Sequence, residues 1–183
     1  MIGSEPPPLI EPAPGALPVM AVVLVDVGVA AGGLDRAAIK ALDVPVTIAL
    51  DPTRPDAAEA AADYRTAGIE VAILAPDLPE GADADAALDA WRKAVPGAVA
   101  VVAGPPLAQA LARAGIARVG AEETQVLDAG RDSEAGVGRA LERVGAGGAT
   151  VLLHSWPASV MGLRAWAETE RGVTPAPVSG LPR

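Results

Sequence analysis

The segments Ala67-Gly68-Ile69-Glu70-Val71 and Ala114-Gly115-Ile116-Ala117-Arg118-Val119 repeat one pattern, in which a helix stops at a glycine and a strand begins at once. Glycine readily takes the left-handed conformation that ends a helix. From Val19 onward, short apolar runs alternate with helical patterns in the same way. Strict alternation of buried strands with helices predicts a parallel sheet, either open or closed as a barrel.

We expect one domain over residues 19–183, preceded by a proline-rich linker or tail over residues 1–18. Caps are expected at Asp35, Asp56, Asp83 or Asp85, and Ser133. The expected strands cover 19–25, 44–50, 69–75, 98–103, 118–120, 126–127, 149–153 and 174–178. The expected helices cover 35–42, 56–67, 83–95, 107–114, 133–144 and 159–171.

Composition excludes several classes of function. The 183 residues carry a formal charge of -9, which disfavours nucleic acids and anionic membranes as partners. The absence of cysteine rules out disulfides and zinc–thiolate sites. No apolar run reaches the ~18 residues of a membrane span, and the start lacks the pattern of a signal peptide. We expect the proline-rich tail to connect to a membrane anchor or a second domain upstream.

The only histidine, His154, ends an apolar run in the stretch Val151-Leu152-Leu153-His154-Ser155-Trp156-Pro157. In a parallel sheet, functional groups gather where the strands end. The residues at those positions are Asp26, Asp51, Asp77, Gly104, Glu122 or Glu123, Asp128 and His154. An acidic rim with one imidazole suits hydrolysis or a hard cation, but loops in an acidic chain also produce such a rim. Neither a phosphate-binding loop nor a Gly-x-Ser-x-Gly elbow is present.

Several segments, taken in order, resemble the divergent polysaccharide deacetylase family. They are Ala21-Val22-Val23-Leu24-Val25-Asp26, Val44-Pro45-Val46-Thr47-Ile48-Ala49-Leu50, Ala67-Gly68-Ile69-Glu70-Val71, Val95-Pro96-Gly97-Ala98-Val99, and His154 with Pro157 and Val178-Ser179. The resemblance covers nearly the whole chain after Pro18, with a shortened Glu122 to Asp132 region. It implies an irregular (β/α) barrel of about seven parallel strands, of the NodB-like deacetylase type.

Enzymes of this family hydrolyse an acetyl group with a divalent metal, such as zinc, held by one aspartate and two histidines. A second aspartate acts as base and a late histidine as acid. The resemblance places the base at Asp26 and the acid at His154, whereas the expected ligand positions hold Val27, Leu74 and Gly104. The resemblance therefore implies a pseudoenzyme that has lost its metal ligands, with Asp26 and His154 as a facing, residual pair.

We expect a degenerate deacetylase-like domain that binds a glycan or a protein of the cell envelope, without a cofactor. By resemblance, it would be periplasmic or membrane-anchored facing the periplasm. One alternative is an active hydrolase with a relocated site, in which Asp26 and His154 act with Asp51, Asp77 or Asp128 around magnesium or calcium. Another is a structural assembly module.

Three tryptophans are the only large aromatic side chains besides a single tyrosine. Trp156 lies beside the expected active end of the sheet, where an indole can stack on a sugar or anchor an interface. We therefore expect Trp156, together with Asp51 and Asp77, to contact the ligand. Trp91 and Trp166 lie on helix faces and are expected in the core.

Overall fold

A computed structural model describes residues 17–130, 132–145, 149–169 and 172–181. Residues 1–16 of the expected tail lie outside this range. The strands are β1 (Val19–Val25), β2 (Thr47–Leu50), β3 (Glu70–Leu74), β4 (Ala100–Ala103), β5 (Ala117–Gly120), β6 (Gln125–Val126), β7 (Thr150–His154) and β8 (Thr174–Ala176). The α-helices are α1 (Arg36–Lys40), α2 (Ala57–Thr66), α3 (Ala84–Ala94), α4 (Ala108–Arg113), α5 (Glu134–Gly145) and α6 (Pro157–Ala167). Short 3-10 helices are η1 (Val29–Ala31), η2 (Pro105–Leu107) and η3 (Val178–Gly180).

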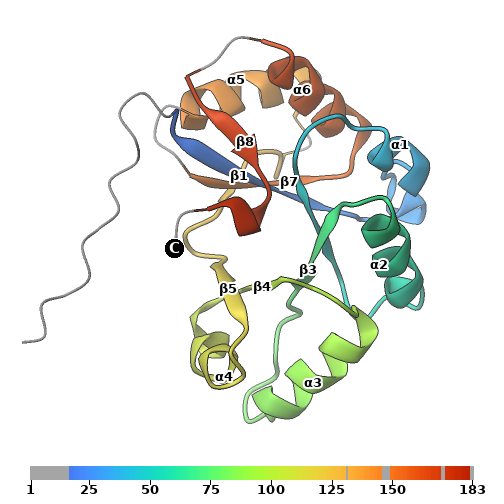
Figure 1. Cartoon of the computed structure of the whole chain (residues 1–183), viewed down its shortest axis with the longest axis vertical. Coiled ribbons are helices and arrows are strands. Elements are labelled where there is room, and N and C mark those ends of the chain that lie inside the picture. The colour runs from blue at the N-terminus through green and yellow to red at the C-terminus, as the bar shows by residue number, and fades with distance from the viewer. Residues whose placement is uncertain (1–16, 131, 146–148, 170–171, 182–183) are drawn as a thin grey trace, which may run out of the picture.

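The strands form one parallel sheet in the order β5-β4-β3-β2-β1-β7-β6, and β8 pairs with β1 off this path. The sheet curls into a half-barrel with the helices on its outer side (Figure 1). In the part of the chain that the structure describes, β5 and β6 are the two ends of this order. The predicted irregular barrel of parallel strands is confirmed.

The two faces of the sheet bury different residues. The outer face carries the large side chains that pack against the helices, among them Leu24, Ile48 and Leu153. The inner face is lined by a smaller apolar cluster: Val23, Val25, Ala49, Ala72, Ala100, Val102, Val119 and Leu152. Three of these residues are alanines, so the side chains inside the curled sheet take up little volume. This agrees with a chain that contains no phenylalanine.

Local signals place most element boundaries within two residues of the prediction. Asp35 caps α1 by accepting from the Ala38 N–H at 2.8 Å, and Asp83 caps α3. Gly68 and Gly115 have φ of 77° and 65°, which confirms their role as left-handed helix ends. Trp91 and Trp166 are 9% and 4% exposed, so both lie in the core as expected.

The predicted boundaries of two elements and one predicted cap are wrong. The second strand begins at Thr47 rather than Val44, because Pro45 cannot donate a ladder hydrogen bond. The last helix begins at Pro157, whose fixed φ suits the first helical turn, and it ends at Ala167. Asp56 stands at the start of α2 without capping it, since both of its carboxylate oxygens bind Arg54.

Among the described residues, none of the helices combines the length and the apolar character needed to cross a lipid bilayer.

Candidate functional site

The carboxyl ends of β1, β3 and β7, together with the loops that follow them, form what we call the mouth of the half-barrel. Val25 of β1 pairs with His154 of β7 on one side and with Ala49 of β2 on the other. Paired residues in a parallel sheet point to the same face. This register places the His154 side chain on the inner face. His154, Val25 and Ala49 form a row of paired residues across the sheet, and the row continues to Ala72 of β3.

His154 is held by a buried carboxylate. Asp128 is 0% exposed, and its Oδ1 lies 2.8 Å from His154 Nδ1. Its Oδ2 accepts from the His154 backbone N–H at 2.7 Å and from the Ser159 hydroxyl at 2.5 Å. Three donors on one carboxylate fix both the carboxylate and the imidazole, so Asp128 and His154 form a preorganised dyad.

The same contacts determine the charge of Asp128. Burial alone would raise its pKa, but the hydrogen bonds from His154 and Ser159 outweigh burial and hold the pKa below its usual value. Asp128 is therefore an anion near neutral pH. It favours the tautomer in which His154 carries its proton on Nδ1, and Nε2 becomes the acceptor.

Trp156 extends this arrangement. Its ring stacks on the His154 imidazole, with centroids 4.4 Å apart and planes inclined by 19°. The His154 side chain is 24% exposed, and Trp156 is half-buried. The mouth thus carries a stacked imidazole–indole pair. Trp156 lies beside the mouth as the sequence predicted, but its stacking on His154 was not predicted.

Asp26 does not face His154, and this is a correction to the predicted pair. Asp26 follows Val25, so the alternation along β1 turns it to the outer face of the sheet. On that face, the hydroxyl of Tyr64 in α2 donates to Asp26 Oδ2 at 2.9 Å. Tyr64 belongs to the large apolar cluster between the sheet and the helices. The partner that the fold gives to His154 is Asp128.

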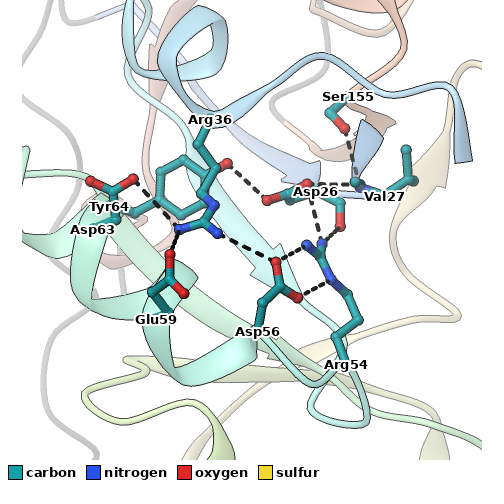
Figure 2. A network of polar contacts seen from close by, with 10 residues as sticks. Asp26, Val27, Arg36, Arg54, Asp56, Glu59, Asp63, Tyr64 and Ser155 are labelled. Carbon is teal, nitrogen blue, oxygen red and sulfur yellow. Dashed lines mark hydrogen bonds and ion pairs between the residues drawn. The ribbon is translucent and has the colours of Figure 1, made fainter. Parts of the chain in front are cut away.

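Asp26 is 3% exposed, and donors surround its carboxylate (Figure 2). Besides Tyr64, the Gly28 N–H donates to Oδ1 at 2.9 Å, and Arg54 Nη1 lies 3.2 Å from the same oxygen. Arg54 Nη1 also donates to the Asp26 carbonyl oxygen at 2.6 Å. A carboxylate held in this way supports the loop after β1, because its two oxygens join that loop to Arg54 and to α2.

Arg54 links Asp26 to a chain of ion pairs between α1 and α2. Arg54 binds Asp56 through Nε at 3.0 Å and Nη2 at 2.7 Å, and these bonds lower the pKa of Asp56. Arg36 continues the chain to Asp56, Glu59 and Asp63, as Figure 2 shows. Burial of Tyr64, with the Asp26 carboxylate beside it, raises the pKa of Tyr64 far above its usual value.

A cavity of about 740 Å³ opens between the loop after β1 and the start of α2. Its lining includes Arg36, Arg54 and Asp56 along with the apolar residues Val29 and Leu34. Arg36 and Arg54 are both already paired with Asp56. A ligand here would contact the network around Asp26 and not the dyad.

The positions at which the resemblance implies metal ligands do not fit a metal. Val27 and Leu74 pack against the inner apolar cluster, and neither side chain has a donor atom. Gly104 follows β4 and has no side chain. Within the described ranges, no three carboxylate or imidazole groups come close enough together to hold a metal ion.

The remaining predicted residues are spread along the same end of the sheet. Asp51 follows β2, and its Oδ1 accepts from the Thr53 N–H at 2.8 Å and hydroxyl at 2.6 Å, which closes a turn. Asp77 is exposed after β3. Glu122 forms an ion pair with Arg118 at 2.8 Å.

Sequence reasoning did not identify Arg54, Tyr64 or Ser159 as members of these networks. Tyr64 carries one signal, because the only tyrosine of the chain lies on the buried stripe of an alanine-rich helix. Ser159 has no such signal, since its partner Asp128 is 31 residues away along the chain.

Comparison with known proteins supports the resemblance drawn from the sequence. Residues 22–102 match the model of a family described as divergent polysaccharide deacetylase. The matched segment contains Asp26, Val27 and Leu74, whereas Gly104 and His154 lie beyond it. The predicted family resemblance is therefore confirmed over this segment. No curated protein sequence matches the chain.

Several solved structures share the fold. A carbohydrate esterase family 4 pseudoenzyme from Bacillus anthracis matches with a TM-score of 0.76 at 13% identity, over 90% of this chain and 65% of that one. This chain thus spans about two thirds of the pseudoenzyme's length. A family 4 carbohydrate esterase from Streptomyces lividans in complex with acetate matches with a TM-score of 0.65 at 14% identity, over 87% of this chain and 93% of that one. An uncharacterized protein from Agrobacterium tumefaciens matches with a TM-score of 0.64 at 18% identity, over 93% and 92%.

Proposed function

We propose that this deacetylase-like domain is a non-catalytic glycan-binding module of the cell envelope, with its ligand at the mouth against His154 and Trp156. One observation carries the proposal. The mouth keeps a buried carboxylate–imidazole dyad, while Val27 and Leu74 fill two expected metal positions with apolar side chains. A fold that keeps its polar dyad without metal ligands can still recognise a ligand by hydrogen bonding and stacking.

The dyad and the indole offer complementary contacts to a sugar. With its proton on Nδ1 toward Asp128, His154 presents Nε2 as an acceptor for a ligand hydroxyl. An indole such as Trp156 can pack against the apolar face of a sugar ring. Asp77, exposed after β3, and Asp51, after β2, are further acceptors for hydroxyl groups at this end of the sheet.

The relatives support the envelope setting. Among proteins of the same fold, one is a peptidoglycan deacetylase from Bacillus subtilis, at 14% identity and a TM-score of 0.59. We infer that the domain is periplasmic or faces the periplasm from the membrane. A glycan or a protein of the envelope would be its partner.

A second candidate is an active hydrolase, and the dyad favours it. A histidine oriented by a buried carboxylate is the arrangement that general acid–base catalysis needs. Such an enzyme would work around Asp128 and His154, without Asp26. A mutant of the Bacillus anthracis pseudoenzyme is described as having restored enzymatic activity, so activity in this fold can be regained.

One experiment separates the two functions. Chito-oligosaccharides are titrated into the protein by isothermal titration calorimetry, and acetate release is measured in the same samples. We expect saturable binding without acetate release, and at least about tenfold weaker binding for Trp156→Ala than for Trp156→Phe. Met161→Ala, on the exposed side of α6, is the control and should bind like the wild type.

Release of acetate by the wild type, lost in His154→Ala, would establish the hydrolase and reject the non-catalytic module. Equal binding by Trp156→Ala and the wild type would remove the mouth as the glycan site.

A further inference from the structure

Two polar side chains face the interior of the half-barrel at its amino end. Thr47 and Glu70 are paired across β2 and β3, and each stands two residues before an inner-face alanine, Ala49 or Ala72. The alternation of the strands therefore turns both side chains inward. Thr47 is 0% exposed, and its hydroxyl donates to Glu70 Oε1 at 2.6 Å.

The partners that complete this pair come from the C-terminal end of the chain. The Val178 N–H donates to Thr47 Oγ1 at 2.8 Å, and the Ser179 N–H donates to Glu70 Oε1 at 3.2 Å. We call residues Pro177–Leu181, which include η3, the C-terminal strap. Its two successive N–H groups donate to the buried Thr47 hydroxyl and to the Glu70 carboxylate. The apolar side chains of the interior have no donors for these oxygens.

The strap also fills space. Val178 packs against the inner cluster, whose middle is lined by the small residues Ala49, Ala72 and Ala100. In Figure 1, η3 lies inside the curve of the sheet, reached from β8. Val178 therefore supplies apolar volume that the alanines of the strands leave open.

The strap's attachment is slight compared with that of the strands around it. Only the three residues of β8 precede it in the sheet, paired with Val19, Met20 and Ala21. Val178 is half-buried, and Ser179 is exposed. A cavity of about 400 Å³ lies beside the strap, lined by Val178 and Leu181 and by Val119 of β5. Segments with few buried contacts open at lower free energy than the core.

We propose that the C-terminal strap is a plug that opens independently of the half-barrel. When open, it exposes the alanine-lined interior and the Thr47–Glu70 pair at the amino end. The plug closes the end opposite to the mouth, so it is a feature separate from the dyad and from glycan binding.

Hydrogen–deuterium exchange of the full chain tests the proposal. In the wild type, amides of residues 172–181 should exchange faster than those of β1 and β7. Thr47→Val removes the acceptor of the Val178 N–H and should accelerate exchange in this segment about tenfold while leaving β1 and β7 protected. Thr66→Val, which changes a threonine on α2 away from the strap, is the matched control and should leave the strap at its wild-type rate.

Val178→Ala is a second variant that leaves Thr47 in place. It should accelerate strap exchange several-fold and increase the fluorescence of 8-anilinonaphthalene-1-sulfonate, because the interior becomes more accessible. The proposal is overturned if the strap exchanges together with β1 and β7 in the wild type. It is also overturned if Thr47→Val and Val178→Ala accelerate all three segments equally.

Discussion

Replacing Asp128 with asparagine is expected to destabilise the protein by about 2–4 kcal/mol at neutral pH. The carboxylate is fully buried and accepts from three donors, two on His154 and one on Ser159. Asparagine offers one acceptor oxygen and places an N–H₂ group where the other oxygen stood. At least one donor then faces another donor inside the protein, and the charge that strengthens all three bonds is gone.

The magnitude follows from these contacts. A hydrogen bond to a charged group contributes about 1.5–3 kcal/mol, and leaving a buried donor unsatisfied costs about 1–3 kcal/mol. The amide oxygen of asparagine can still accept one of these bonds, so the expected loss of stability is about 2–4 kcal/mol and not the full sum of both contributions. For a domain of this size, 1 kcal/mol corresponds to about 2–4 °C, so the melting temperature should fall by roughly 5–15 °C.

The effect should depend on pH in one direction. The folded-state pKa of Asp128 lies below its unfolded value of about 3.9, so its contribution is fully present above that pH. The contribution is lost as the pH falls through the folded-state pKa, where the wild type becomes protonated. The difference in stability between wild type and Asp128→Asn should therefore shrink between about pH 5 and pH 2.

Urea unfolding followed by tryptophan fluorescence at several pH values provides the measurement. Asp77→Asn, which neutralises an exposed carboxylate near the same end of the sheet, is the control and should lie within about 0.5 kcal/mol of wild type. A stabilising role for the buried Asp128 carboxylate is refuted if Asp128→Asn is as stable as Asp77→Asn at pH 7. It is equally refuted if its deficit stays constant down to pH 2.

Three further predictions use the same unfolding measurement. Ser159→Ala should cost about 1–3 kcal/mol, less than Asp128→Asn, because it removes one of the three donors and leaves His154 bound; an equal loss would contradict the shared network. Tyr64→Phe should cost about 1–3 kcal/mol by removing a donor from the buried Asp26, and a neutral result would show that this bond is dispensable. Gly33→Ala should cost about 1–3 kcal/mol, because its Cβ would lie 2.7 Å from Ser155 Oγ and from a Val27 methyl group, whereas Gly138→Ala, with open space in α5, should be neutral or stabilising.

The order of elements could be predicted because each signal is local. Helix-ending glycines such as Gly68 and Gly115 act through their own backbone, and the aspartate caps at Asp35 and Asp83 act within one helical turn. The cap predicted at Asp56 failed because a side chain two residues earlier, Arg54, competes for the same oxygens. The sequence shows both residues but not which contact forms.

The candidate site was predictable only in part. The sequence places His154 at a strand end because an apolar run comes directly before it. Trp156 follows two residues later, so the same reasoning places it close to His154. Asp128 was one of three carboxylates expected to act with His154 in the hydrolase alternative, but the sequence could not select it, because it lies in a region where the strand signal is only two residues long. Asp26 was assigned to the same site because both residues end strands, but a shift of one residue turns a side chain to the opposite face.

The mouth carries a preorganised dyad, and we expect that it cannot hold the divalent metal used by the deacetylases that this chain resembles. Isothermal titration of zinc into the full chain, with acetate release from chito-oligosaccharides measured on the same preparation, tests it most directly. We expect no stoichiometric zinc binding and no acetate release. One-to-one binding at micromolar zinc accompanied by acetate release would contradict it.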